Sequence, residues 1–316
     1  MHGHEIFHLK DIDRRNLLRA AGIGTGIYFL NSLDLSASAA SSVNLPGFAA
    51  FASSVKVTKN SKYYLVESSG LPAHPMMKGI VNWQQQVPTP QPYTGSNAWS
   101  IPIKPVISKS PMSAKNHFLR GAIAVAVNGI PIFNALNNRG DDALLAGELD
   151  DWGGHCGRAD DYHYHIAPLH LQSVIGKKVP IAYALDGFPI YGETEIDGKA
   201  VGKLDEFNGH FDSKKNYHYH GTKTYPYING GFKGVVQEIE GQVDPQSATK
   251  AFRPAGTPLK GATITQCEQI SANTFDLKYA LGNQTYQIKY FADLTSVQMT
   301  FISPDGTERT ESYMRK

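Results

Sequence analysis

The chain has 316 residues, of which 41% are hydrophobic and 18% are charged. This length and composition are typical of one large or two modest globular domains with real cores, and they exclude a disordered chain. The formal net charge of +2 arises from charges spread along the sequence, so no basic block marks a surface for nucleic acid or for an anionic membrane. A small ligand or an ion is therefore the expected partner.

Residues 1–39 are typical of an export signal. The segment Asp13-Arg14-Arg15-Asn16-Leu17-Leu18-Arg19 resembles a twin-arginine motif, and a weakly apolar stretch follows at residues 20–33. The alternative is a membrane anchor, but this stretch falls short of the ~20 apolar residues that span a bilayer. We predict cleavage after Ala37-Ser38-Ala39, export by the twin-arginine machinery, a periplasmic or secreted mature protein, and no stable membrane insertion.

The next part of the chain predicts short strands at residues 55–58 and 62–67, followed by an irregular proline-rich connection at residues 88–111. Beyond it, three sequence blocks occur twice in the same order. Residues 127–133 return as 185–191, residues 149–155 return as 204–210, and Tyr162-His163-Tyr164-His165 returns letter for letter as Tyr217-His218-Tyr219-His220. The repeat predicts two tandem copies of one supersecondary unit, which we call the first unit (residues 121–165) and the second unit (residues 180–220).

Each unit begins with an apolar run and an Asx-Gly step, Asn128-Gly129 or Asp186-Gly187, which is a strong signal for a β-hairpin. Residues 141–149 of the first unit can form a short capped helix. Farther on, residues 275–281, 285–291 and 297–302 alternate as strands do, with a turn at Pro304-Asp305-Gly306. We predict a mostly β protein whose duplicated hairpin units form a sheet or sandwich-like core with few short helices. A domain at residues 40–240 is expected to precede a C-terminal β extension or small subdomain at residues 262–316.

The histidines of the two units have identical spacing. In each unit a histidine after glycine is followed eight and ten residues later by two more, which gives the triplets His155, His163, His165 and His210, His218, His220. Residues two apart in a strand share a face, so two imidazoles can reach one ion at ~2.0–2.1 Å, with the third histidine delivered by a loop. A single histidine is usually structural, but six at duplicated spacing predict a transition metal site. Copper or zinc is favoured, and iron is possible.

The residues around these histidines allow two interpretations. The alternating tyrosines Tyr162, Tyr164, Tyr217 and Tyr219 are predicted to pack on the opposite strand face. Four carboxylates can orient the imidazoles or form turns, and the turn is favoured for Asp186 because its counterpart is Asn128. These carboxylates are Asp160, Asp161, Asp186 and Asp212, and the weaker ligand candidates elsewhere are His74, His117 and His170.

The two cysteines, Cys156 and Cys267, are predicted to form a disulfide in an oxidising compartment. The alternative makes Cys156, which follows a key histidine, a thiolate ligand to copper or zinc.

The Tyr-His-Tyr-His motifs, the two Gly-His steps, residues 186–192 and residues 225–234 together resemble the YHYH-domain family of secreted proteins. The resemblance covers about residues 70–234. The resemblance implies metal binding, which is the usual conjecture for this family. It implies no particular activity, because none is established for the family. Family members often carry a cysteine near the Gly-Gly-His step that pairs with another soon after the motif, whereas here only Cys267 is left as a partner for Cys156.

Three functions remain open at this point. The first is a metalloenzyme, a hydrolase or an oxidoreductase, with an open coordination position. The second is a periplasmic metal carrier or sequestering protein, and the third is a glycan-binding module without metal, in which aromatic residues stack on sugar rings. For the metal functions, we expect two-fold packing of the units to bring both triplets into one shared pocket.

Overall fold

The computed structural model describes residue 43 and residues 45–315, all within one unit of the chain, Ala40–Lys316. The predicted export signal lies outside the described residues. Strands dominate, as the sequence predicts, and short helices are few: α1 (Gln172–Ile175), η1 (Phe48–Phe51), η2 (Gly95–Asn97) and η3 (Leu169–Leu171). Among the described residues, no helix has the length and apolar character that crossing a membrane requires.

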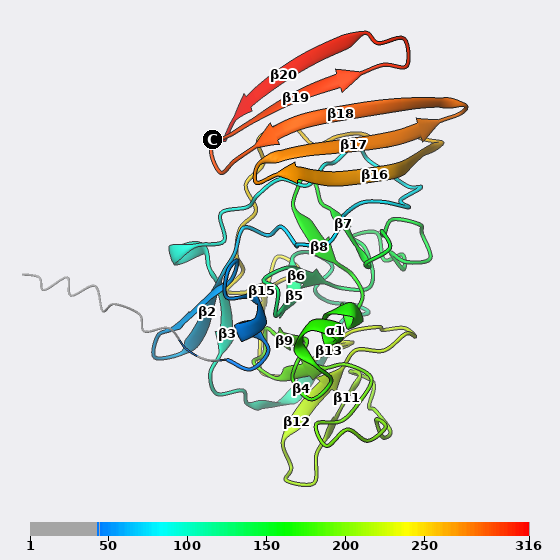
Figure 1. Ribbon diagram of the computed structural model, residues 1–316. Coiled ribbons are helices and arrows are strands. Elements are labelled where there is room, and N and C mark those ends of the chain that lie inside the picture. Colours follow the sequence, from blue (N-terminus) through cyan, green and yellow to red (C-terminus); the bar gives the residue numbers. More distant parts are fainter. Residues whose placement is uncertain (1–42, 44, 316) are drawn as a thin grey trace, which may run out of the picture. The chain divides into compact units, whose positions relative to one another are not determined.

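The two units form one eight-stranded sheet (Figure 1). The strand order is β11-β12-β10-β9-β5-β6-β8-β7, so each unit occupies one half of the sheet. The first unit supplies β5 (Ala122–Ala126), β6 (Pro131–Phe133), β7 (Gly154–Cys156) and β8 (Tyr162–Tyr164). The second unit supplies β9 (Ala182–Ala184), β10 (Pro189–Tyr191), β11 (Gly209–Phe211) and β12 (Tyr217–His220).

A local two-fold axis relates the halves of this sheet. Strands β5 and β9 pair antiparallel at the centre, with Val125 directly opposite Tyr183. These two residues occupy the same position in the repeat, so the axis passes between them. Every residue of β5 and β9 is buried, as expected for central strands that are covered on both faces.

The Asx-Gly steps form the hairpin turns that the sequence predicts. Gly129 has φ 80° and Gly187 has φ 94°, values that glycine adopts without strain, and the antiparallel pairs β5–β6 and β9–β10 follow. The predicted helix at residues 141–149 is wrong. That segment is a series of turns in which Asp142 Oδ1 accepts the N–H groups of Leu144 and Leu145, and it ends at Gly147 with φ 70°. So short a segment cannot hold a helix without packing one face, and Leu145 is 81% exposed.

The segments before the first unit form a smaller sheet. Strands β1 (Lys56–Lys59) and β2 (Tyr63–Glu67) match the predicted pair, and β3 (Trp99–Pro102) adds to β2. The expectation of an irregular connection at residues 88–111 is therefore wrong in part, because this passage contains β3 and the start of β4 (Ile107–Ser113). Strand β4 pairs with β13 (Gly231–Gly234) beyond the second unit.

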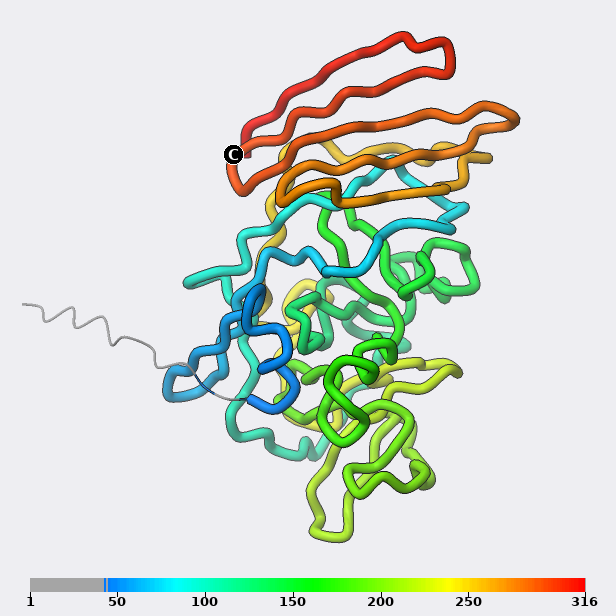
Figure 2. Tube along the Cα trace, in the orientation of Figure 1, coloured from blue at the N-terminus to red at the C-terminus, as the bar shows by residue number. Residues whose placement is uncertain are grey.

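The C-terminal part is a five-stranded antiparallel meander, and Figure 2 traces this part of the chain in orange and red. The sequence predicts its three central strands and the turn after them, and misses the outer two. Backbone bonds between Ile264 and both Gly79 and Ile80, and a bond from the Tyr290 hydroxyl to Pro88 O, join the meander to the preceding chain. Its strands are β16 (Ala262–Ser271), β17 (Thr274–Leu281), β18 (Gln284–Ala292), β19 (Ser296–Ile302) and β20 (Glu308–Met314).

The connection between the second unit and the meander carries a buried ion pair. After the hairpin of β14 (Gln237–Ile239) and β15 (Gln242–Asp244), the Arg253 guanidinium binds both carboxylate oxygens of Asp160, at 2.7 and 2.9 Å. Asp160 has φ 57°, and its Oδ1 also accepts the Val87 N–H at 3.0 Å. The pair anchors the loop between β7 and β8, which holds two of the first triplet's histidines in register.

The predicted disulfide is absent, and both cysteines are buried free thiols. Burial raises the pKa of Cys156 well above its usual range and that of Cys267 to about 12, so both thiols are protonated at neutral pH. Cys156 is also not a ligand of the histidine cluster, because it follows His155 on strand β7 and adjacent strand residues face opposite sides of a sheet.

Candidate metal centres

In both units, the histidine spacing follows from the register of an edge hairpin. His155 on β7 lies directly opposite His163 on β8, and His210 on β11 lies directly opposite His218 on β12. Such cross-strand neighbours have Cβ atoms ~4.5–5.5 Å apart on one face, and the last histidine of each motif lies two residues along that face. The prediction that a loop carries the first histidine of each triplet is therefore wrong, because His155 and His210 lie on strands β7 and β11.

The glycine before the first histidine makes room for a tyrosine on the other face. A Cβ on Gly154 would lie 2.5 Å from the Tyr162 hydroxyl, and a Cβ on Gly209 would lie 2.2 Å from the Tyr217 hydroxyl. Each hydroxyl donates to a loop carboxylate, Asp150 or Asp205, which also accepts backbone N–H groups of its own turn. Sequence reasoning gave Asp150 and Asp205 no role, although both lie in a repeated block.

The second tyrosine of each motif binds the hairpin turn. Tyr164 OH accepts from Asn128 Nδ2 at 3.0 Å, and Tyr219 OH donates to Asp186 Oδ2. Asp186 also forms the predicted turn by accepting the Phe188 N–H at 3.2 Å. The four tyrosines thus pack on the face opposite the histidines, as predicted, and they fix the strands that carry the ligands.

The first centre consists of His155, His163 and His165, whose ligand nitrogens lie within 4.8 Å of one another. His155 Nε2 lies 3.0 Å from His165 Nε2. The Phe133 ring stacks on His163 with centroids 3.9 Å apart and covers one side of the cluster. Two nitrogens at ~2.0–2.1 Å from a tetrahedral ion lie about 3.4 Å apart, so the triplet has the spacing of a ligand set.

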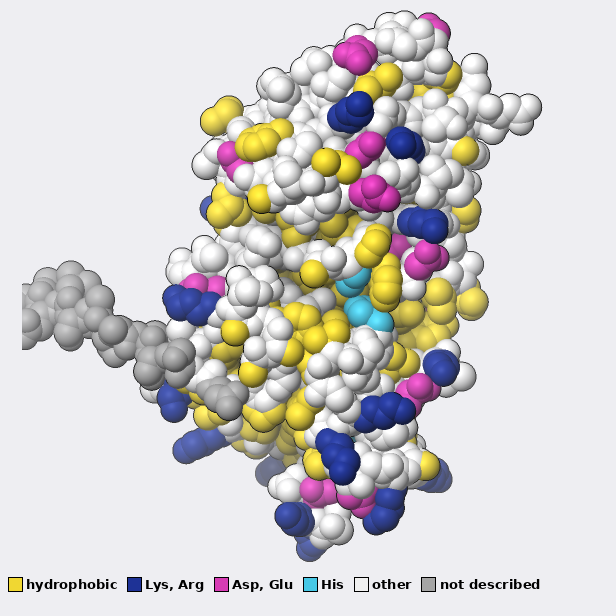
Figure 3. Space-filling model, viewed as in Figure 1, with side chains coloured by type: hydrophobic (Ala, Val, Ile, Leu, Met, Phe, Trp, Pro, Cys, Tyr) yellow, Lys and Arg dark blue, Asp and Glu magenta, His cyan; other side chains and the backbone are white. Residues whose placement is uncertain are grey.

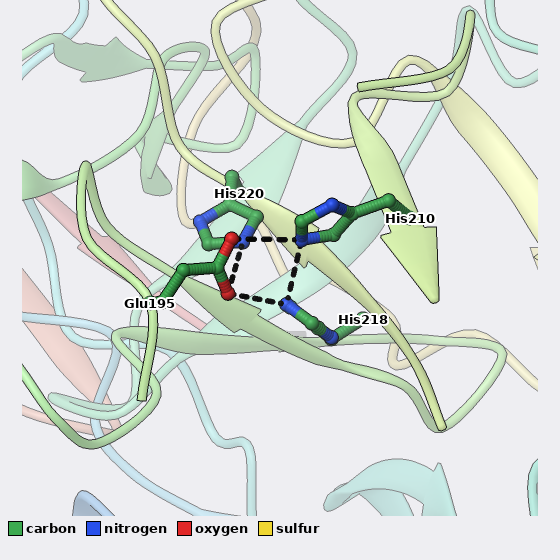
Figure 4. Close-up of side chains that lie close together, drawn as sticks. All are labelled: Glu195, His210, His218 and His220. Atoms are coloured by element: carbon green, nitrogen blue, oxygen red, sulfur yellow. Dashed lines mark hydrogen bonds and ion pairs between the residues drawn. The ribbon is translucent and has the colours of Figure 1, made fainter. Parts of the chain in front are cut away.

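The second centre consists of His210, His218, His220 and a carboxylate that sequence reasoning missed, Glu195 (Figure 4). Glu195 Oε1 lies 3.1 Å from His210 Nε2, and Oε2 lies 3.3 Å from His218 Nε2 and 3.7 Å from His220 Nε2. The His210 and His218 Nε2 atoms are 3.0 Å apart. Four donors therefore surround one point.

Backbone carbonyls orient the imidazoles. His165 Nδ1 donates to Asn134 O at 2.5 Å, His220 Nδ1 donates to Gly192 O at 2.7 Å, and His163 Nδ1 donates to Asp161 O at 2.9 Å. A ring that donates through Nδ1 keeps a lone pair at Nε2, the form that binds metal. Of the four carboxylates considered from sequence, only Asp161 touches a ligand, chiefly through its backbone, whereas Asp160 pairs with Arg253 and Asp212 closes a turn.

Four of the six histidines are held neutral, as metal ligands must be. Burial lowers the pKa of His165 to about 3 and that of His220 to about 4, and it lowers the pKa of His155 and His218 in the same direction. Positive charge on the neighbouring histidines adds to this effect. His220 Nε2 is buried without a hydrogen-bond partner, and its lone pair faces the other donors of the second centre.

The two centres do not share a pocket, which corrects the expectation from the repeat. The two-fold axis does pair equivalent edges, but they are the edges of β5 and β9, and the motif strands lie outward on both sides. Five strand spacings separate β8 from β12, about 24 Å at ~4.8 Å each. A single ion cannot bridge that distance.

The remaining histidine candidates do not belong to either centre. His74 and His170 lie on the far face of β8, with rings 5.0 Å apart, and His74 also stacks on Trp152 and bonds to the Tyr164 hydroxyl. Figure 3 shows histidine side chains at the surface among hydrophobic ones. His117 is paired with Glu238 at 2.7 Å.

Residues 98–200 match the family model described as YHYH protein. No curated protein sequence and no solved structure matches the chain. The matched segment holds the first motif and ends before the second.

Proposed function

We propose that the protein binds two transition metal ions, one at each centre. The observation that carries the proposal is the buried Nε2 atom of His220, which has no hydrogen-bond partner and faces Glu195 and two further imidazoles. A buried lone pair is costly when it is unpaired. An ion at ~2.0–2.1 Å from each donor removes this cost.

The donor set indicates the class of ion. Neutral imidazoles with at most one carboxylate suit zinc, copper or iron, whereas magnesium and calcium prefer oxygen ligands. We therefore propose copper or zinc, with iron as the next choice.

The test is elemental analysis of the mature protein purified from its own compartment without added metal. We expect about two equivalents of one transition metal per chain, falling towards none after dialysis against a chelator and returning when the ion is added back. A matched control lacks both triplets, with all six histidines replaced by glutamine. Equal metal content in that control, or less than a tenth of an equivalent in the native protein and after reconstitution, would refute the proposal.

We also propose export through the twin-arginine pathway. Replacing Arg14 and Arg15 together by lysine is expected to retain the precursor in the cytoplasm, because the paired guanidinium groups are the recognised feature of such signals. Cell fractionation with immunoblotting measures the result. The Arg19→Lys variant, which keeps the pair, serves as the control and should be exported. Normal export of the double variant would exclude this route.

A further inference from the structure

The two centres differ at one equivalent position. The repeat continues past the hairpins at a constant offset, which aligns Asn137 of the first unit with Glu195 of the second. Their backbones make equivalent hydrogen bonds: Asn137 N–H donates to Asp141 O at 2.8 Å, and Glu195 N–H donates to Lys199 O at 2.9 Å. An amide thus stands in the first unit where a carboxylate completes the second centre.

The amide of Asn137 is engaged in its own turn. Its Oδ1 accepts the N–H groups of Arg139 at 2.9 Å and Asp141 at 3.1 Å, and its Nδ2 faces the Glu148 carboxylate at 3.3 and 3.4 Å. In the second unit Asp197 closes the same turn by accepting the Lys199 N–H at 3.0 Å. Glu195 is therefore free to face the histidines, whereas Asn137 is not.

The first unit has a buried carboxylate nearby, but other groups bind it. Glu148 is paired with the Arg139 guanidinium and accepts from the side-chain amides of Asn137 and Asn82. Among the residues that the structure describes, the first centre consequently has three histidine donors and no acidic one, and the second has four donors.

This difference changes both coordination and charge. A divalent ion held by three neutral imidazoles keeps its full charge of about +2 and an open fourth position, which is the arrangement of reactive metal sites. At the second centre Glu195 fills that position and reduces the net charge to about +1. An anion is therefore favoured at the first centre on both counts.

We propose that the first centre binds a small anionic ligand, one that coordinates the ion end-on through nitrogen or oxygen, at the position that Glu195 fills in the second centre. This inference rests on the proposed function. It assigns different roles to the two copies, with exogenous ligand binding at the first centre and a closed coordination sphere at the second.

Azide binding to the copper-loaded protein tests the inference, because azide bound to Cu²⁺ gives a new charge-transfer absorption. Each centre is isolated in a variant that keeps the other: H210Q/H218Q retains the first centre and H155Q/H163Q retains the second. A third variant adds Glu195→Gln to H155Q/H163Q, which keeps the size of the side chain and removes its charge. Electron paramagnetic resonance confirms full copper occupancy, and circular dichroism confirms the fold.

We expect a saturable azide band in H210Q/H218Q, at least a tenfold weaker response in H155Q/H163Q, and recovery of the band when Glu195→Gln is added. Equal azide affinity in the two isolated centres, or no band in H210Q/H218Q, would overturn the inference. The absence of an azide band in the fully copper-loaded H155Q/H163Q variant with Glu195→Gln would also overturn it. Failure of both isolated centres to bind copper would instead refute the proposed function, so the two failures are distinguishable.

Discussion

The H155Q/H163Q and H210Q/H218Q variants are each expected to lose one of two metal equivalents and to keep the other. The reason is the separation of about five strand spacings, which leaves the centres without a common ligand. Metal content per chain measures the result directly. Loss of both ions from either variant would point to a shared site.

The same variants allow the contribution of each metal ion to the free energy of unfolding to be measured. An ion at 100 times its dissociation constant stabilises the folded protein by about 2.7 kcal/mol, provided that it binds the unfolded chain weakly. We expect this increment from each centre, and the two increments should add, because neither unit reaches the other's ligands. Chemical denaturation with and without chelator gives both values, and the six-glutamine protein should show no effect of chelator.

Replacing Arg253 by methionine is expected to lower the free energy of unfolding by about 3–5 kcal/mol, because it leaves the Asp160 carboxylate buried without its counter-charge. The measurement is urea denaturation of the metal-free protein. The control is R253M/D160N, which removes both charges and preserves a residue type that tolerates φ 57°. The double variant should recover much of the loss. A single variant within about 1 kcal/mol of the wild type would contradict the prediction.

The loss in free energy of unfolding caused by Arg253→Met should also depend on pH. Burial raises the pKa of Asp160, and the hydrogen bonds and charge of Arg253 oppose this effect, so the pKa rises further when Arg253 is removed. A carboxyl group whose pKa is higher in the folded than in the unfolded state costs stability as pH rises from the unfolded value through the folded one. The difference between R253M and wild type is therefore expected to be larger at about pH 7.5 than at about pH 5.

Sequence periodicity was sufficient for the repeated unit and its histidines because both depend on local geometry. An Asx-Gly step fixes a hairpin, and residues that recur at equal spacing must occupy equal positions in two copies of one backbone. The faces of the tyrosines and histidines follow from alternation along a strand. The helix prediction for residues 141–149 was wrong, although the apolar spacing there suits a helix. Gly147 has a positive φ, and the segment has no apolar face packed along its length.

The arrangement of the units required the fold itself. Two hairpin units can pair through either edge, and the observed pairing of β5 with β9 places the ligand strands outward. The sequence repeat does not reveal Glu195, because the clear similarity between the units at residues 185–191 ends four residues before it. Extending the alignment at the same offset pairs Glu195 with Asn137. The signal in the sequence was therefore a carboxylate a few residues after the second hairpin, at the position equivalent to an amide in the first unit.

The pairing of β5 with β9 also limits the number of copies. A two-fold contact uses the same edge of both partners, so it closes on itself and does not extend as a solenoid does. A third unit would find this edge already occupied at both copies, and the outer strands β7 and β11 offer only three residues each. A solitary unit would expose the β5 edge and could satisfy it by pairing with another copy of itself. The tandem repeat is in this sense a homodimer within one chain, in which equivalent positions can differ: Glu195 faces the histidines of the second centre, whereas Asn137 is bound in its own turn.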